Sequence, residues 1–279
     1  MDLTSFSKFS QVSGVYSKFL KDELVQTPTL LLQQIEHNRF ESFVSANLTN
    51  IFYKEANLYL DKALYQYILS RKLITSENFS WGAVTQYYAS FFVISGLIRL
   101  HEVAFVRIGA NDYEIQPDTG MVYKIRLMKT KGLHRSVWET YYKLYKNFTH
   151  TNQVFSCVMT PYMSDIYFDT NRRNDINYAP SKGYDEIYQT KTTINRLKKD
   201  RTGDSYSPTN FYKENEWVDV SVLTQHRIRL LANLVFKIDG QSDFPVQAKE
   251  RVDNREKIIQ RYENDIRYRK RYLSWIKGE

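Results

Sequence analysis

The stretch SWGAVTQYYASFFVISGLIRL, from Ser80 to Leu100, is apolar around most of the circumference that a helix would present. A helix of this kind lies at the centre of a bundle, because each of its sides needs an apolar neighbour. Small residues along it would let neighbouring helices come close: Ala83, Ala89, Ser90, Ser95 and Gly96. Its most apolar part, YYASFFVISGLIRL, is too short to cross a bilayer and carries the charged Arg99 at its end. We therefore expect a mainly α-helical bundle built around this helix.

Helical spacing is also found upstream of the central stretch. Apolar residues recur every three or four positions from Leu3 to Leu24, which predicts one amphipathic helix. A second helix is expected to start at Thr27-Pro28 and run through Phe40, since proline suits a first helical turn. The clearest apolar face predicts a third helix from Phe52 to Arg71.

The periodicity changes after the central helix. The segments AFVRI (Ala104–Ile108) and MVYKIRL (Met121–Leu127) contain β-branched residues with polar ones interleaved. The turn-type sequences GAND and PDTG lie between them. We expect a small β-hairpin or a three-stranded insert at about residues 103–128.

Helical spacing then returns until the end of the chain. Helices are expected at 137–148, from Pro161 to Asn177, at 217–238 and at 246–277, with a polar loop at 198–216. We interpret residues 1–200 as a helical bundle domain with the β insert. Residues 201–279 would form the polar loop and basic C-terminal helices, packed on the same domain.

Composition favours a cytoplasmic protein. The only cysteine is Cys157, so the 279 residues contain no internal disulfide, and a reducing compartment is expected. The sequence MDLTSFSKFSQVSG lacks a cationic segment followed by an apolar core, and no stretch is as long as a membrane-spanning helix. No membrane partner is expected.

The net charge of +8 makes an anionic partner such as nucleic acid plausible, although charge can also serve solubility alone. No Gly-rich phosphate loop, His-Glu-x-x-His motif or cysteine pair is present. The five histidines are scattered: His37, His101, His134, His150 and His226. We therefore expect neither a metal nor another cofactor. His226, beside Arg227 and Arg229, is the histidine best suited to a surface contact.

The C-terminal segment is strongly basic. From Lys249 to Lys277 it has ten lysines and arginines against five acidic residues, with tyrosines and a tryptophan interleaved. Aromatic rings beside cations could stack bases while guanidinium groups hold phosphates. The predicted nucleic-acid contacts here are Arg267, Arg269, Lys270 and Arg271. The alternative is an ordinary amphipathic helix with a solvated charged face.

A second cationic group lies in NRRNDINYAP, Asn171 to Pro180. A helix would bring Arg172 and Arg173 to adjacent surface positions, where both could bind nucleic acid. A local ion pair is the alternative explanation, since Asp169 precedes Arg173 by four residues.

The central stretch WGAVTQYYASFFVISGLIRL and the later RRNDINY together resemble the HEPN superfamily. Tyr87, Tyr88, Ala89 and Phe92 are similar to the family's Tyr-Tyr-Ala plus aromatic pattern, and Arg173-Asn174 is similar to the start of its arginine–histidine motif. The resemblance covers roughly residues 50–195. It implies a helical bundle, dimerisation, frequent metal-independent RNA cleavage, and association with toxin–antitoxin or anti-phage defence systems.

The chain departs from the family where the histidine should follow, because Tyr178 stands there. A tyrosine, with a pKa near 10, is a poor general base at neutral pH. We therefore expect a HEPN-like protein that binds RNA or another polyphosphate and forms a homodimer or binds a protein partner, without an intact ribonuclease site. One alternative is a metal-independent endoribonuclease using Arg173 with Asn174 and Tyr178. The other is a purely protein-binding subunit of a larger complex.

Overall fold

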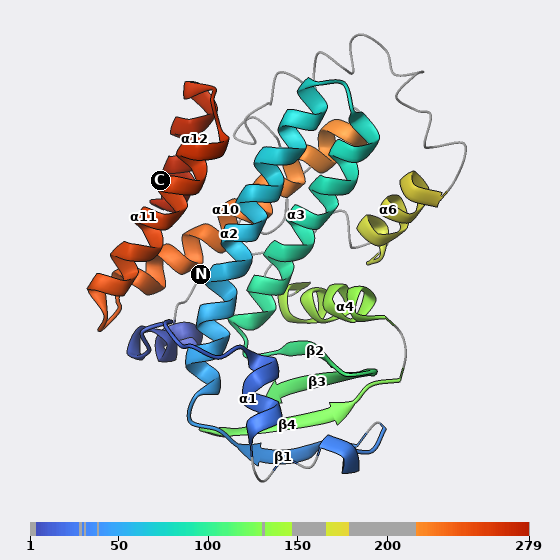
Figure 1. The fold of residues 1–279 in the computed structure, drawn as a ribbon, viewed down its shortest axis with the longest axis vertical. Helices are drawn as coiled ribbons and strands as arrows, with labels where there is room; N and C mark the ends of the chain where they lie inside the picture. Colours follow the sequence, from blue (N-terminus) through green and yellow to red (C-terminus); the bar gives the residue numbers. More distant parts are fainter. Residues whose placement is uncertain are drawn as a thin grey trace.

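The computed structural model describes residues 4–27, 30, 32–37, 39–129, 132–146, 166–178 and 216–278. In this part of the chain the fold is mainly α-helical with a small antiparallel sheet, which confirms the predicted fold class. Two long helices from the first half of the chain stand side by side over the sheet, and the other helices pack around them (Figure 1).

The centre of the fold is the helix pair α2 (Leu48–Thr75) and α3 (Phe79–Arg99), as predicted. Gly96 of α3 shows why small residues are needed there. A Cβ at this position would lie 2.6 Å from Cδ2 of Leu231 and 3.3 Å from the carbonyl oxygen of Ala56. The helices α2 and α3 and the helix that contains Leu231 therefore approach one another closely at Gly96, which has no side chain.

The predicted insert is a meander of three strands, β2 (Ala104–Ile108), β3 (Asn111–Pro117) and β4 (Val122–Leu127). A fourth strand, β1 (Glu41–Val44), which the sequence did not predict, pairs antiparallel with β4 and gives the order β1-β4-β3-β2. Its four residues are too few for the alternation of burial to be recognised in sequence.

The N-terminal helices differ from the prediction. Instead of one helix over residues 3–24 there is a 3-10 helix, η1 (Thr4–Gln11), followed by α1 (Leu20–Gln26). Gly14 between them has a positive φ of 66° and donates its N–H to Oδ1 of Asn50, so the chain turns there. The second predicted helix is also wrong in its described residues, which contain only η2 (Leu32–Gln34) before β1.

Three helices pack against the central pair. The helix α4 (Leu133–Tyr145) lies between α3 and the sheet, α6 (Phe168–Tyr178) covers the same side of α3, and α10 (Glu216–Gly240) crosses α2 and α3 (Figure 1). All three match predicted helices in their described parts. Residues 147–165 and 179–215, including Phe148, Cys157, Pro161 and most of the predicted polar loop, lie outside the described residues.

The predicted C-terminal helix over residues 246–277 is two helices, α11 (Pro245–Tyr262) and α12 (Ile266–Ile276). Glu263 has extended backbone angles and ends α11. The side chain of Asp265 then accepts the N–H of Arg267 at 2.8 Å and caps α12. No proline or glycine marks this break, which explains why helical spacing alone missed it.

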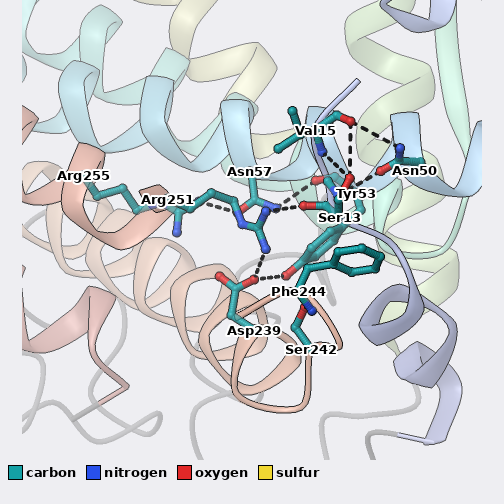
Figure 2. Close-up of polar contacts among 11 residues, drawn as sticks. Ser13, Val15, Asn50, Tyr53, Asn57, Asp239, Ser242, Phe244, Arg251 and Arg255 are labelled. Carbon is teal, nitrogen blue, oxygen red and sulfur yellow. Dashed lines mark hydrogen bonds and ion pairs between the residues drawn. The ribbon is translucent and has the colours of Figure 1, made fainter. Parts of the chain in front are cut away.

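Buried polar contacts attach α11 to the rest of the fold (Figure 2). The hydroxyl of Tyr53 in α2 donates to Asp239 of α10 at 2.6 Å, and Arg251 of α11 donates to the same carboxylate at 2.5 Å. Arg255 donates to Asp61 at 2.8 Å and also to Asn57. Two of the ten C-terminal cations therefore serve the interior of the protein.

Candidate anion-binding site

The helix α6 places its two neighbouring arginines in different surroundings. Arg172 is buried, with only 5% of its surface exposed, whereas Arg173 is half-buried. The prediction that both lie at the surface is therefore wrong for Arg172. Successive residues of a helix are rotated by about 100°, so burying one of two neighbours leaves the other nearer the rim.

Asp169 does not neutralise Arg173 in the way that the local ion-pair alternative required. Its carboxylate binds Arg227 of α10, which donates from Nη1 and Nη2 at 2.9 and 3.1 Å. Both side chains are almost fully buried. Burial raises the pKa of Asp169 from its ordinary value, whereas the charge of Arg172 lowers it. This bidentate pair attaches α6 to the core.

Arg173 has no hydrogen bond or ion pair with any described residue, and its Nε is buried without a partner. Its terminal nitrogens are not among the buried atoms. The guanidinium carbon lies 5.3 Å from the ring centroid of Tyr87, which gives a cation–π contact but no counter-charge. An uncompensated, half-buried guanidinium is suited to binding an external anion.

A histidine that the sequence did not assign to this site lies beside Arg173. His134, in the first turn of α4, hydrogen-bonds through Nδ1 to the Tyr87 hydroxyl at 2.8 Å and stacks on Phe91 with ring centroids 4.2 Å apart. Burial and the charge of Arg173 lower the pKa of His134, so the ring is neutral near pH 7. Its Nε2 has no partner among the described residues and is not sealed from solvent.

The start of α4 adds further positive potential. Gly132 precedes the helix and offers no side chain to cap its first N–H groups. A helix N-terminus attracts anions through these N–H groups and the aligned peptide dipoles. Arg135 is exposed in the same turn and lies over the ring of Tyr167 at 5.0 Å. We call Arg173, His134, Arg135, Tyr87 and Tyr88 the Arg173 site.

The other predicted catalytic residues of α6 are less well placed. Asn174 is half-buried, and no described residue makes a hydrogen bond with its side chain. Tyr178 is 75% exposed at the last position of the helix. Tyr178 lies five residues after Arg173 in the helix, so the two side chains leave the helix in directions about 140° apart. Tyr178 therefore does not occupy the position beside Arg173 that His134 occupies.

The predicted nucleic-acid residues of α12 lie on the other side of the central helices from α6 (Figure 1). Arg267 pairs with Asp265 at 2.9 Å with its side chain 80% exposed, and Arg269 donates to the carbonyl oxygen of Glu263. Arg271 lies over the ring of Tyr268, and Lys270 is exposed. One chain therefore does not combine the α6 and α12 arginines into a single site.

The remaining histidine prediction is wrong: His226 is 7% exposed, and its neighbour Arg227 is fully buried. In the described residues no three histidine, cysteine or acidic side chains are grouped to hold a metal ion. None of the helices in the described part has both the length and the apolar character needed to span a membrane.

Comparisons with known proteins gave no match. A scan against protein-family models found none, and neither the search of curated proteins nor that of solved structures found a similar protein. The resemblance to the HEPN superfamily stays a prediction, and the function must be argued from the Arg173 site itself.

Proposed function

We propose that the chain binds single-stranded RNA at the Arg173 site. The observation that carries this proposal is the guanidinium of Arg173, which is half-buried and has no counter-charge among the described residues. Keeping a cation in such a place is unfavourable unless an anion neutralises it. A phosphate oxygen is the anion that a forked guanidinium binds best.

The neighbouring groups suit a nucleic-acid strand better than a lone anion. Arg135 and the start of α4 extend the positive potential, so a second phosphate can bind beside the first. Tyr88 is half-buried beside Tyr87 and offers a ring on which a base can stack. Unpaired bases are available for such stacking only in single strands.

Fluorescence anisotropy with a labelled 12-nucleotide RNA at two salt concentrations tests the proposal. We expect binding that weakens steeply with salt, because phosphate contacts release counterions. Arg173→Ala should weaken binding about tenfold or more and reduce the salt slope by about one. Arg39→Ala is the matched control, since it removes the same charge from an exposed position. Equal affinities for the two variants would contradict the proposal.

A second candidate function, metal-independent RNA cleavage, is favoured by the position of His134. A neutral imidazole with an accessible Nε2 can accept the proton of a 2′-hydroxyl. Arg173 would stabilise the negative charge that develops on the attacked phosphate. The 2′-oxygen would bond to phosphorus as its proton passes to His134. The bond from phosphorus to the 5′-oxygen of the next nucleotide would break, and that oxygen would take a proton from water, giving a 5′-hydroxyl and a 2′,3′-cyclic phosphate.

Incubation of end-labelled RNA with EDTA tests for cleavage. Wild-type protein should produce fragments that end in a cyclic phosphate, and His134→Gln should abolish them. Binding by His134→Gln should stay within about threefold of wild type, because the phosphate contact of Arg173 remains. Tyr178→Phe is the control for the alternative in which Tyr178 is catalytic, and it should cleave normally. Intact RNA with the wild-type protein would leave binding as the function.

A further inference from the structure

A cavity of about 480 Å³ lies between α1, α2, the end of α3 and the edge strand β2, and no residue of the Arg173 site lines it. This volume falls in the range of small-molecule sites. The cavity combines apolar and aromatic walls with charged groups at its two ends. The residues that carry the argument are Phe19, Tyr59, Phe105, Lys21, Lys62 and Arg99.

The floor of the cavity has one open hydrogen-bond donor. Arg99 is 4% exposed and donates from Nε to Glu55 at 2.8 Å and from Nη1 to the carbonyl oxygen of Val103 at 3.0 Å. Its Nη2 has no partner among the described residues and is not a sealed atom. The other oxygen of Glu55 accepts the N–H of Leu20. Glu55 therefore neutralises the charge of Arg99, and Nη2 of Arg99 can still donate a hydrogen bond to a ligand.

The walls present aromatic rings. Phe19 is 48% exposed. The ammonium of Lys54, a residue of α2, lies 3.8 Å from the centroid of the Phe19 ring. Tyr59 stacks on Phe92 with ring centroids 6.1 Å apart and planes at 26°. Phe105 of β2 also lines the cavity. Such surfaces favour a flat, aromatic ligand.

The mouth is positively charged. Arg107 is paired with Asp112 at 2.7 Å, and Asp61 with Arg255 at 2.8 Å, so these lining charges are balanced. Lys21 and Lys62 are exposed, and neither has an acidic partner among the described residues. Two ammonium groups without an acidic partner among the described residues therefore belong to the exposed part of the lining.

We propose that this cavity binds a nucleoside monophosphate. The base enters between the rings of Phe19 and Tyr59, with a base carbonyl accepting a hydrogen bond from Nη2 of Arg99. The sugar fills the middle of the cavity, and the phosphate remains at the mouth with Lys21 and Lys62. A phosphate monoester carries close to two negative charges at pH 7, which match the two lysines better than the single charge of an aromatic carboxylate does.

Calorimetric titration with guanosine 5′-monophosphate and its fragments tests the assignment. The full nucleotide should bind saturably, whereas guanosine, ribose 5-phosphate and inorganic phosphate should each bind at least tenfold more weakly. This pattern requires both the aromatic walls and the charged mouth. Inorganic phosphate binding as tightly as the nucleotide would overturn the proposal, and so would tighter binding of indole-3-acetate, a planar aromatic carboxylate.

Three exposed variants locate the site on the chain. Phe19→Ala, Lys21→Ala and Lys62→Ala should each weaken nucleotide binding about fivefold or more. Trp81→Ala and Lys249→Ala remove exposed side chains elsewhere and should leave it unchanged. Arg173→Ala should also bind the nucleotide normally, which separates this cavity from the RNA proposal. Wild-type affinity in all three cavity variants, or no binding by wild type at 1 mM nucleotide, would overturn the inference.

Discussion

Arg227 of α10 and Arg267 of α12 carry the same guanidinium group in opposite surroundings. The side chain of Arg227 is fully buried and binds Asp169 of another helix, whereas that of Arg267 is 80% exposed and pairs with Asp265 two residues away. The first pair connects elements that are distant in sequence, and the second caps its own helix. Both count equally in the net charge of +8, yet only one is open to a ligand.

Arg173 lies between these extremes. It is enclosed enough for its Nε to be buried, but no carboxylate of the described residues pairs with it as Asp169 pairs with Arg227. A cation is suited to binding an external anion when the fold encloses it without neutralising it. The density of charge along the sequence indicates neither whether a cation is enclosed nor whether it is neutralised.

The largest effect is expected from Arg227→Met. It removes the cation of a buried pair and leaves the carboxylate of Asp169 without its partner, so the free energy of unfolding should fall by about 3–5 kcal/mol. Urea unfolding followed by circular dichroism measures the loss. The double variant Asp169→Leu with Arg227→Met should recover more than half of it, because both charges of the pair are then removed together. A loss below about 1 kcal/mol in the single variant would show that the pair is not buried in solution.

An effect of intermediate size is expected from the half-buried His101. Burial and the nearby charge of Lys8 lower the pKa of His101 to about 4. The unfolded chain, with a histidine pKa near 6.5, then binds one more proton than the folded protein between about pH 4 and 6.5. The contribution of His101 to the free energy of unfolding is therefore fully present above about pH 6.5. It is lost on acidification, by about 2 kcal/mol at pH 5.

His101→Gln checks this sign, since glutamine does not titrate and can still hydrogen-bond to Tyr145, the present partner of His101. Urea unfolding at pH 7.5 and pH 5 should show a smaller acid-induced loss in the variant than in wild type, by about 2 kcal/mol. Identical losses would mean that His101 is solvated in the folded protein.

The smallest effect is expected from Arg267→Ala. Its ion pair is exposed, so the free energy of unfolding should change by no more than about 0.5 kcal/mol. The same urea experiment measures it beside Arg227→Met. RNA binding by this variant should match that of Arg39→Ala if the Arg173 site carries the affinity, and a tenfold loss would move the proposed contact to α12.

The long helices were predictable because their apolar residues repeat over many turns. The central pair α2 and α3 needed only this periodicity. The strand β1 and the break at Glu263 were not predictable, since four residues give too little pattern and the break contains neither glycine nor proline. Local composition is a weak guide where tertiary contacts decide the conformation.

The candidate site was only partly predictable. Arg173 was found from its own segment, but the burial of Arg172 depends on α6 lying against the core. His134 was missed because it belongs to another helix. It precedes Arg173 in the sequence, whereas the arginine–histidine motif places its histidine after the arginine. The partner of Asp169 was equally hidden, since Arg227 lies 58 residues downstream.

The pairing of β1 with β4 has a consequence for how the chain folds. It joins Val44 to Val122 across the whole helical hairpin, and closing so long a loop is slow. The α2–α3 hairpin and the β2–β3–β4 meander need only nearby contacts and can assemble earlier. Until β1 docks, β4 is an open edge that a second unfolded chain can pair with. Once docked, the four-residue β1 replaces β4 as the edge of the sheet, and a short edge strand offers fewer groups for such pairing.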